Sequence, residues 1–409
     1  MQLYWIWFAE LKNVSLLQKH RLLEQFGDPE TLHHTAELAL ENAGVSASVR
    51  KALQDKDLQK AKDILRSCEQ KNIRLLPVTD MAYPRRLANT PDAPVLLYYK
   101  GILPKWESVP FIGIVGTRKA SVYGLQVARH MGSQIASAGG IVVSGGASGG
   151  DSAAMQGALD AGYPVVGVLG CGVDVVYPRS NRAMFEKVLE KGCLISEYAP
   201  GEQPEPWHFP VRNRIISGVS NGVLVVEAPK KSGALITADT ALQQGRDVFV
   251  VPGNIDNPNC EGSNRLLQEG ATPVLSGWDV VSCYEFLYPG KLKKHNPVPL
   301  YTGETALAKV AQTAATPKEK TEKPETARKN IIDNDEISSY SVLENAHPAL
   351  SDEERTILAE LTDDPTEPAQ IIDKLAMPAG KVLSVLTMLT VKGLACKHPG
   401  GRFAIRRKL

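Results

Sequence analysis

Residues 111–151 contain the same pattern twice: a short apolar run, a glycine-rich turn and a segment with helical periodicity. The first apolar run, Phe111–Val115, is typical of a buried parallel strand, and residues 141–143 have the same character. Strands that alternate in this way with helices predict an α/β domain built on a parallel sheet.

The two glycine-rich turns are candidates for binding phosphate. The first precedes a helix expected to begin near Ser121 or Val122, and the second precedes a helix expected over residues 151–161. A helix start presents unpaired N–H groups and partial positive charge, and glycine lets the backbone approach a ligand closely. Glycines also serve tight turns and helix packing, so a purely structural role fits them too. The candidate residues are Gly116, Thr117, Arg118 and Lys119 in the first turn, and Ser144, Gly145, Gly146 and Ala147 in the second.

Two common nucleotide-binding patterns are absent from the sequence. The second strand ends in Ser144-Gly145-Gly146 rather than in the acidic residue that accompanies a dinucleotide fingerprint. No G-x-x-x-x-G-K-[ST] loop occurs either. The sequence therefore predicts no cofactor.

Further apolar runs at 165–169, 194–196, 223–227 and 248–251 alternate with helical segments. This alternation predicts a doubly wound, mostly parallel sheet with helices on both faces. In such sheets ligands bind beyond the carboxyl ends of the strands. The loops that follow the strands are therefore the expected site.

A segment between two of these strands, residues 206–216, contains Phe209, Arg212, Asn213 and Arg214. Proline before a helical run suits the first helical turn, so we expect the arginines to flank a helix start. Residues two apart on a helix point to nearly opposite sides. One arginine should therefore pair with a carboxylate such as Glu197 or Glu227.

The aromatic residues of this segment have two interpretations. Trp207 and Phe209 could stack on exposed bases, although an aromatic residue beside proline is more often part of the core. His208 has no partner acid or nucleophile in register, so we expect no catalytic role for it. A third amide-rich helix start follows at Ser232, a plausible N-cap, and adds Ser232, Gly233 and Thr237 to the candidate residues.

The composition of the 409 residues narrows the class of protein further. A formal net charge of +1 does not indicate nucleic acid binding by the chain as a whole, so any basic surface must be local. Six cysteines lack C-x-x-C spacing, which argues against a metal site and favours the reducing cytoplasm. The apolar start, residues 1–8, is too short to span a membrane.

Four regions are expected along the chain. Residues 1–72 should form a helical bundle and residues 73–288 the sheet domain, followed by a flexible linker over 289–348. Residues 349–409 read as three helices and a hairpin, a winged helix. Its third helix, residues 378–391, is poor in cations, which favours protein contact or weak DNA contact over base-specific reading.

These motifs together resemble the DNA-processing protein A family (DprA, also called Smf). The resemblance rests on Gly116-Thr117-Arg118, on Ser144-Gly145-Gly146-Ala147 with Asp151, on Gly170-Cys171-Gly172 with Tyr177-Pro178, on Ile195-Ser196-Glu197-Tyr198, on residues 209–216, and on residues 232–238. It implies an extended Rossmann-like fold between a sterile-alpha-motif-like bundle and a winged helix. It also implies a homodimer that binds single-stranded DNA in natural transformation and helps to load the RecA recombinase, without catalysis.

One departure from the family pattern is Met155, which stands where members usually carry a histidine. A thioether takes up no proton at neutral pH, so only a packing role is expected there. The alternative function is that of a nucleotide-processing hydrolase from a related Rossmann-like group. Its P-G-G-x-G-T-x-x-E signature is absent from both glycine loops.

Overall fold

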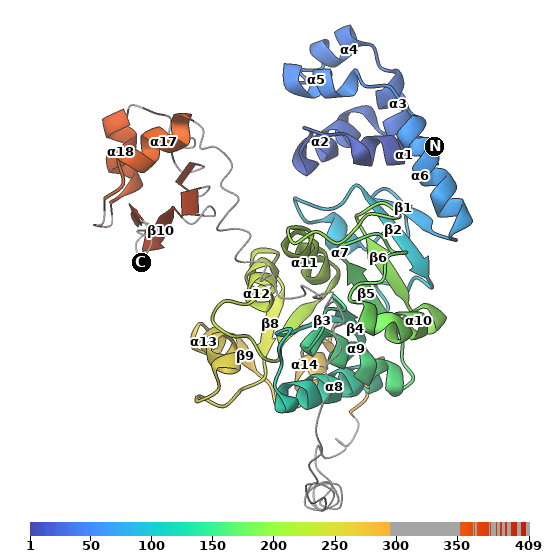
Figure 1. Ribbon diagram of the computed structural model, residues 1–409, viewed down its shortest axis with the longest axis vertical. Helices are drawn as coiled ribbons and strands as arrows, with labels where there is room; N and C mark the ends of the chain where they lie inside the picture. The colour runs from blue at the N-terminus through green and yellow to red at the C-terminus, as the bar shows by residue number, and fades with distance from the viewer. Residues whose placement is uncertain are drawn as a thin grey trace, which may run out of the picture. The chain divides into compact units, whose positions relative to one another are not determined.

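The computed structural model describes residues 1–294 and, with gaps, residues 352–405. Its contacts divide the chain into two compact units, Met1–Thr321 and Glu322–Leu409, which we describe separately (Figure 1). Most of the expected linker over 289–348 lies outside the described residues.

The first unit is built on a nine-stranded sheet with the order β1-β2-β6-β5-β4-β3-β7-β8-β9. The strands from β6 to β9 are parallel to one another, and β2 runs antiparallel to both of its neighbours. The predicted strands coincide with β3 to β8 to within two residues at each end. The strands are β1 (Arg74–Pro77), β2 (Leu96–Gly101), β3 (Phe111–Val115), β4 (Ile141–Ser144), β5 (Val165–Leu169), β6 (Cys193–Ser196), β7 (Gly222–Val225), β8 (Asp247–Val250) and β9 (Thr272–Pro273).

Helices cover both faces of this sheet, which confirms the predicted doubly wound α/β fold (Figure 1). Alternate residues of a strand point to opposite faces, so Ile112 and Ile114 join one core while Phe111 and Val115 join the other. The first face carries α8 (Val122–Ser137), α9 (Gly150–Asp160), α10 (Arg182–Lys191) and α14 (Gly277–Val281). The second carries α7 (Arg85–Ala88), α11 (His208–Val219), α12 (Gly233–Gln243) and α13 (Glu261–Gln268). Short 3-10 turns are η1 (Arg179–Asn181), η2 (Pro258–Cys260) and η3 (Ser282–Tyr284).

Two glycines let α8 and α9 pack backbone against backbone. A Cβ atom added at Gly132 would lie 2.8 Å from the carbonyl carbon of Ala154, and one at Gly157 would lie 2.7 Å from that of Arg129. Only glycine permits so close an approach. The helices that follow the two glycine-rich loops are therefore held directly against each other.

The predicted N-terminal bundle is present and precedes the sheet (Figure 1). Its helices are α1 (Gln2–Glu10), α2 (Leu16–Phe26), α3 (Pro29–His34), α4 (Glu37–Asn42), α5 (Ala47–Leu53) and α6 (Gln59–Gln70). A capping box between Ser15 and Gln18 begins α2. The Nζ atom of Lys71 lies 2.6 Å from Oδ2 of Asp174, and a ring nitrogen of His20 lies 2.8 Å from the carbonyl oxygen of Ala93. Both contacts fix the bundle to the sheet domain.

A lysine is buried where α1 meets α2. The side chain of Lys19 is 5% exposed, and its Nζ atom donates to the carbonyl oxygen of Ala9 at 2.6 Å. Burial lowers the pKa of Lys19 from 10.5 to about 8, which Glu197 and Glu10 partly offset. The folded bundle therefore solvates the ammonium group of Lys19 less well than water does.

The second unit contains α17 (Asp352–Ala359), α18 (Pro368–Leu375) and a hairpin of β10 (Ala395–His398) and β11 (Arg402–Ile405). Ile357, Ile371, Leu386 and Phe403 are among its buried core residues. This arrangement confirms the predicted winged helix. Most of the expected third helix, residues 378–391, lies outside the described residues, so its cation content stays a sequence-based expectation.

Candidate functional site

The carboxyl ends of the parallel strands meet at one edge of the sheet. From β3 the chain continues outward through β4, β5 and β6, whereas β7, β8 and β9 lie on the other side of β3. The strand order therefore reverses between β3 and β7, where doubly wound proteins bind their ligands. The loop after β3, residues 116–120, lies at this position.

The helix start that follows this loop is occupied by a carboxylate from the chain itself. Glu227 is 1% exposed, and its carboxylate accepts from the backbone N–H of Ser121 at 2.9 Å and from its hydroxyl at 2.6 Å. Ser121 caps α8 by accepting from the N–H of Gly124, and the helix begins at Val122, where the sequence predicts its start. Thr117 is mostly buried, and its N–H donates to the carbonyl oxygen of Glu227 at 2.8 Å. A phosphate at this helix start would have to displace Glu227.

A second carboxylate of the protein, that of Asp151 in α9, binds backbone amides of the glycine-rich loops. Asp151 is 6% exposed and accepts from the backbone N–H groups of Gly116, at 3.2 Å, and of Ala147. Burial raises the pKa of Asp151, and the nearby guanidinium of Arg212 opposes that effect. Amide groups of both glycine-rich loops thus already bind an anion of the protein.

Most residues of the second loop face the protein interior. The hydroxyl of Ser144 is buried and donates to the carbonyl oxygen of Ile114 at 2.6 Å. Gly146 is buried with a φ of +63°, and a Cβ atom added there would lie 2.6 Å from Cε1 of Phe185. A Cβ atom at Gly145 would lie 2.5 Å from Nη2 of Arg212. These glycines are required by the packing of the loop.

The two arginines of α11 point to different partners, as their spacing predicts. Arg214 pairs with Glu197, one of the two carboxylates that the sequence suggests for this role. Arg212 is 3% exposed, and its Nη1 donates to the carbonyl oxygen of Gly145 at 2.8 Å and to that of Val168. Burial lowers the pKa of Arg212 to about 10. Both arginines lie within the helix rather than at its start. Arg212 holds the second loop in place through its bond to Gly145.

At the third candidate helix start, that of α12, polar side chains of the protein bind the local backbone groups. Ser232 is buried, and its Oγ accepts from the N–H of Ala234 at 3.2 Å, so it is the N-cap of α12 as predicted. Thr237 is 1% exposed and donates to the carbonyl oxygen of Gly233 at 3.2 Å. The same carbonyl accepts from Nδ2 of Asn213 at 3.3 Å. These polar groups fasten α11 to α12.

Exposed cations and half-buried aromatic rings remain at this edge. The guanidinium of Arg118 is exposed and lies 4.9 Å from the ring centroid of Phe209, which is within cation–π distance. The rings of Phe209 and Tyr177 are 5.5 Å apart. Lys119, the next residue along the loop, is also exposed. Arg118, Phe209 and Tyr177 therefore form one surface, which we call the arginine–aromatic surface.

Two further arginines beside this surface were missed by the sequence reasoning. Arg179 and Arg182 are exposed and flank Asn181, whose Nδ2 donates to the carbonyl oxygen of Gly146 at 2.9 Å. Within residues 1–294, no ion pair neutralises Arg118, Arg179 or Arg182. The sequence feature that could have indicated these two arginines is the polar run Arg-Ser-Asn-Arg directly after Tyr177-Pro178.

His208 and Met155 both lie in the interior of the fold. His208 is fully buried, its Nδ1 lies 3.0 Å from the carbonyl oxygen of Gly170, and its ring stacks on Tyr198 at 3.9 Å. Met155 is fully buried and packs near Gly167, which matches the expected packing role. The described residues contain no cluster of side chains suited to a metal ion. No helix among them is long and apolar enough to cross a membrane.

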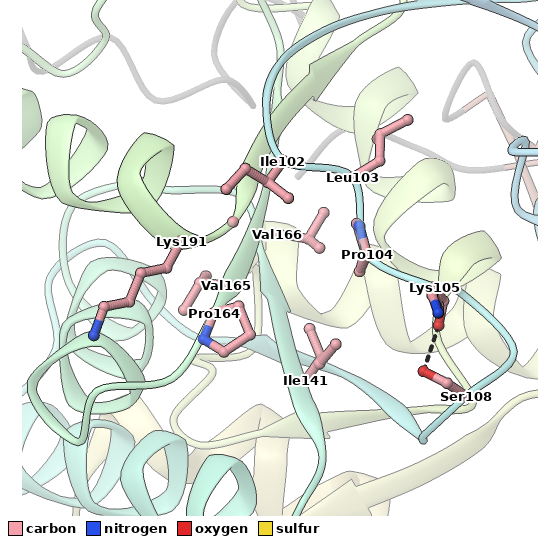
Figure 2. A pocket seen from close by; sticks show the side chains of 11 residues that line it. Ile102, Leu103, Pro104, Lys105, Ser108, Ile141, Pro164, Val165, Val166 and Lys191 are labelled. Atoms are coloured by element: carbon pink, nitrogen blue, oxygen red, sulfur yellow. Dashed lines mark hydrogen bonds between the residues drawn. The ribbon is translucent and has the colours of Figure 1, made fainter.

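A cavity of about 220 Å³ lies at the opposite edge of the sheet, away from these residues. Figure 2 shows Ile141 and Val165, at the beginnings of β4 and β5, facing Ile102 and Leu103 of the loop after β2. Its lining is mostly apolar, and it includes none of the predicted site residues.

Fold and site together define a class of protein: a doubly wound α/β domain with an arginine–aromatic surface at its carboxyl edge, joined in sequence to a winged helix. Comparison with known families agrees with this class. The model of DNA recombination-mediator protein A matches residues 74–285, and that of the DprA winged helix domain matches residues 343–401. The chain belongs to the DprA family, whose members are described as DNA-processing proteins.

Individual relatives support the same assignment. Protein Smf of Synechocystis is 33% identical over 99% of this chain and 99% of its own. The DNA processing protein DprA of Bacillus subtilis is 40% identical over 53% of this chain and 73% of its own. The X-ray structure of DNA processing protein A from Streptococcus pneumoniae matches with a TM-score of 0.61 and 32% identity, covering 72% of this chain and 99% of that one.

Proposed function

We propose that this protein binds single-stranded DNA at the carboxyl edge of its sheet. The main observation in support of this proposal is the contact of Arg118 with Phe209, whose ring lies beside that of Tyr177. The cations Arg118, Lys119, Arg179 and Arg182 supply attraction for a phosphate backbone. The aromatic rings supply faces on which bases stack without regard to sequence.

Single strands fit this surface better than duplexes do. Bases in a duplex are already stacked on one another, so their faces are not available to an aromatic side chain. The phosphate contacts would come from exposed side chains rather than from backbone amides, because Glu227 already occupies the start of α8 and Asp151 binds the N–H groups of Gly116 and Ala147. Gly145, Gly146, Arg212 and Ser232 would then hold the loops in place without touching DNA.

In the cell, this binding would protect incoming single strands and help to load a RecA-type recombinase during natural transformation. The description of the family as a recombination mediator supports this role, since a mediator acts together with a recombinase. We also propose a homodimer, because the sheet ends in the edge strand β9 and Leu275, two residues beyond that strand, is 83% exposed. None of the six cysteines forms a disulfide bond, which is compatible with the cytoplasm.

The proposed role involves no catalysis. A nucleotide-processing hydrolase would need its phosphate cradle open, and the carboxylates of Glu227 and Asp151 would repel a nucleotide phosphate from both loops. Incubation of the purified protein with nucleoside monophosphates, followed by chromatography, should yield no free base. Release of a base that is lost in an Asp151→Asn variant would favour the hydrolase instead.

The test of DNA binding is fluorescence anisotropy with oligothymidylates across a salt series. Arg118→Ala should weaken binding and reduce the slope of log affinity against log salt by about 0.7, the effect of one lost phosphate contact on a single strand. Arg129→Ala is the matched control: Arg129 is also exposed and on the adjoining helix α8, but it pairs with Asp160. Equal affinities and slopes for Arg118→Ala and the unmodified protein would refute this site, as would a preference for duplex.

A further inference from the structure

The beginning of α8 presents apolar side chains to solvent next to the basic loop. Val122 is 74% exposed and Tyr123 is 44% exposed, immediately after the loop that carries Arg118 and Lys119. Ile255, in the loop after β8, is 89% exposed. Single exposed apolar residues are common on protein surfaces. What distinguishes these three is their position relative to the arginine–aromatic surface.

The loop after β8 borders the basic loop on the side away from Phe209. Nδ2 of Asn259 donates to the carbonyl oxygen of Lys119 at 2.9 Å, which joins the two loops. On the other side, a Cβ atom added at Gly170, directly after β5, would lie 3.1 Å from the Phe209 ring. In the sheet, β5 and β8 lie on opposite sides of β3. The basic loop after β3 is therefore bracketed by Phe209 on one side and by the Ile255 loop on the other.

Tyr123 lies on the side of α8 that faces α14 rather than on the side that faces α9. Gly124 faces inward to Glu227, and successive residues of a helix are rotated by about 100°. Residues 123, 127, 130 and 134 thus share one side, and Gln134 on that side bonds to Gly277 of α14. Leu125 and Arg129 share the opposite side, where Arg129 contacts α9.

We propose that Tyr123 is a second base-stacking position, so that a bound strand crosses the carboxyl edge from Phe209, past Arg118 and Lys119, to Tyr123. Its ligand is an unpaired base of any sequence, because every base has a face that stacks on an aromatic ring. This inference rests on the proposed function and extends the contact area beyond the arginine–aromatic surface.

The test compares full-length Tyr123→Ala and Tyr123→Phe proteins with oligothymidylates from about 4 to about 16 nucleotides, the range of common single-strand site sizes. Tyr123→Ala should weaken binding of the long strands about tenfold, the effect expected for one lost stacking contact. The shortest strands, which cannot span both stacking positions, should bind as they do to the unmodified protein. Tyr123→Phe keeps the ring and should restore the affinity for long strands. The salt slope should stay unchanged in both variants, because no phosphate contact is lost.

The remaining outcomes overturn the inference. They are an unchanged affinity of Tyr123→Ala at every length, an equal loss at every length, or a loss that accompanies a lower melting temperature. A second measurement is ultraviolet crosslinking of an oligonucleotide that carries 5-iododeoxyuridine, with the attached peptide identified by mass spectrometry. Absence of a crosslink to Tyr123 argues against the inference. If Arg118→Ala weakens binding and Tyr123→Ala does not, only the second position fails; if neither variant matters, the proposed site itself fails.

Discussion

The carboxylate of Glu227 accepts hydrogen bonds from both the backbone N–H and the hydroxyl of Ser121, 106 residues earlier in the chain. This contact places a negative charge at the start of α8, where the helix dipole favours one. The positive charge that the loop presents to solvent must then come from a side chain, and the guanidinium of Arg118 is exposed there. Glycine-rich loops in this protein are therefore a support for cations and not an open anion site.

Substitution of Glu227 tests this arrangement. In Glu227→Gln the amide group can accept only one of the two bonds and turns a donor towards the other, so unfolding free energy should fall by about 1–3 kcal/mol in urea denaturation. DNA affinity measured well below the melting temperature should fall less than tenfold, because Arg118 remains. Glu186→Gln, at an exposed position on α10, serves as the control. A gain in affinity for inorganic phosphate would instead mean that Glu227 blocks a functional anion site.

A substitution at Gly146 should act on the fold and not on DNA contact alone. Gly146 has a positive φ, and an added methyl group would collide with Phe185. We expect Gly146→Ala to lose about 1–3 kcal/mol of stability from strain and overpacking. Trimming the neighbour in Gly146→Ala/Phe185→Leu should show a favourable interaction energy in a double-mutant cycle. Strict additivity of the two substitutions in thermal denaturation would argue against the predicted collision.

The fold was largely accessible from the sequence because each element carries a local signal. Ser232 is a recognisable N-cap and begins the helix expected of it, and the helix expected near Ser121 or Val122 begins at Val122. The strands were recognisable as short apolar runs between glycine, proline and charged residues. Such signals depend on neighbours within one turn or one strand, so they survive without any knowledge of tertiary structure.

The residues that surround the site were harder to predict from the sequence, because their positions depend on the order of the strands in the sheet. Nothing near Glu227 in the sequence reveals that β7 lies beside β3 and brings its carboxylate to Ser121. Arg212 follows a proline as a phosphate-binding arginine would, yet α11 turns it inward to the carbonyl oxygen of Gly145. Arg179 was missed because its proximity to the second loop follows from the contact of Asn181 with Gly146.

Replacement of the buried Lys19 should stabilise the protein at neutral pH. At about 1.4 kcal/mol per pH unit, the difference between a pKa of about 8 in the folded chain and 10.5 in the unfolded chain corresponds to about 3 kcal/mol. Lys19→Met removes this cost but also the bond to Ala9, so a gain of about 1–3 kcal/mol at pH 7 is expected. Urea denaturation provides the measurement.

The pH dependence of this gain has a defined sign. The pKa of Lys19 is lower in the folded chain, so the unfolded chain binds more protons between about pH 8 and 10.5, and the unmodified protein gains stability as pH rises through this window. The advantage of Lys19→Met should therefore be full below about pH 8 and should shrink towards pH 10.5. An advantage that does not change with pH would mean that the lysine is solvated in the folded protein.

A fragment of residues 1–294 should keep most of the affinity for single-stranded DNA, because the arginine–aromatic surface lies within it. The fragment should not end at Tyr288: Leu292 is 8% exposed, and the N–H of Lys293 donates to the carbonyl oxygen of Ala138 at 3.0 Å. Anisotropy should show a modest loss on long oligonucleotides and almost none on short ones, since a second weak contact adds avidity only where a strand can reach it. Loss on short and long strands alike, with circular dichroism unchanged, would place the primary site in the winged helix.

The direct contact of α8 with α9 limits which segments of this protein can be exchanged with those of its relatives in chimeric proteins. Because Gly132 and Gly157 leave no side chain between the two helices, the pair has a spacing that helices bearing larger residues cannot reproduce. A chimera that takes only one of these helices from another scaffold would separate the loops before them by the width of a side chain. Residues 111–160 are therefore a single cassette, to be exchanged or grafted whole.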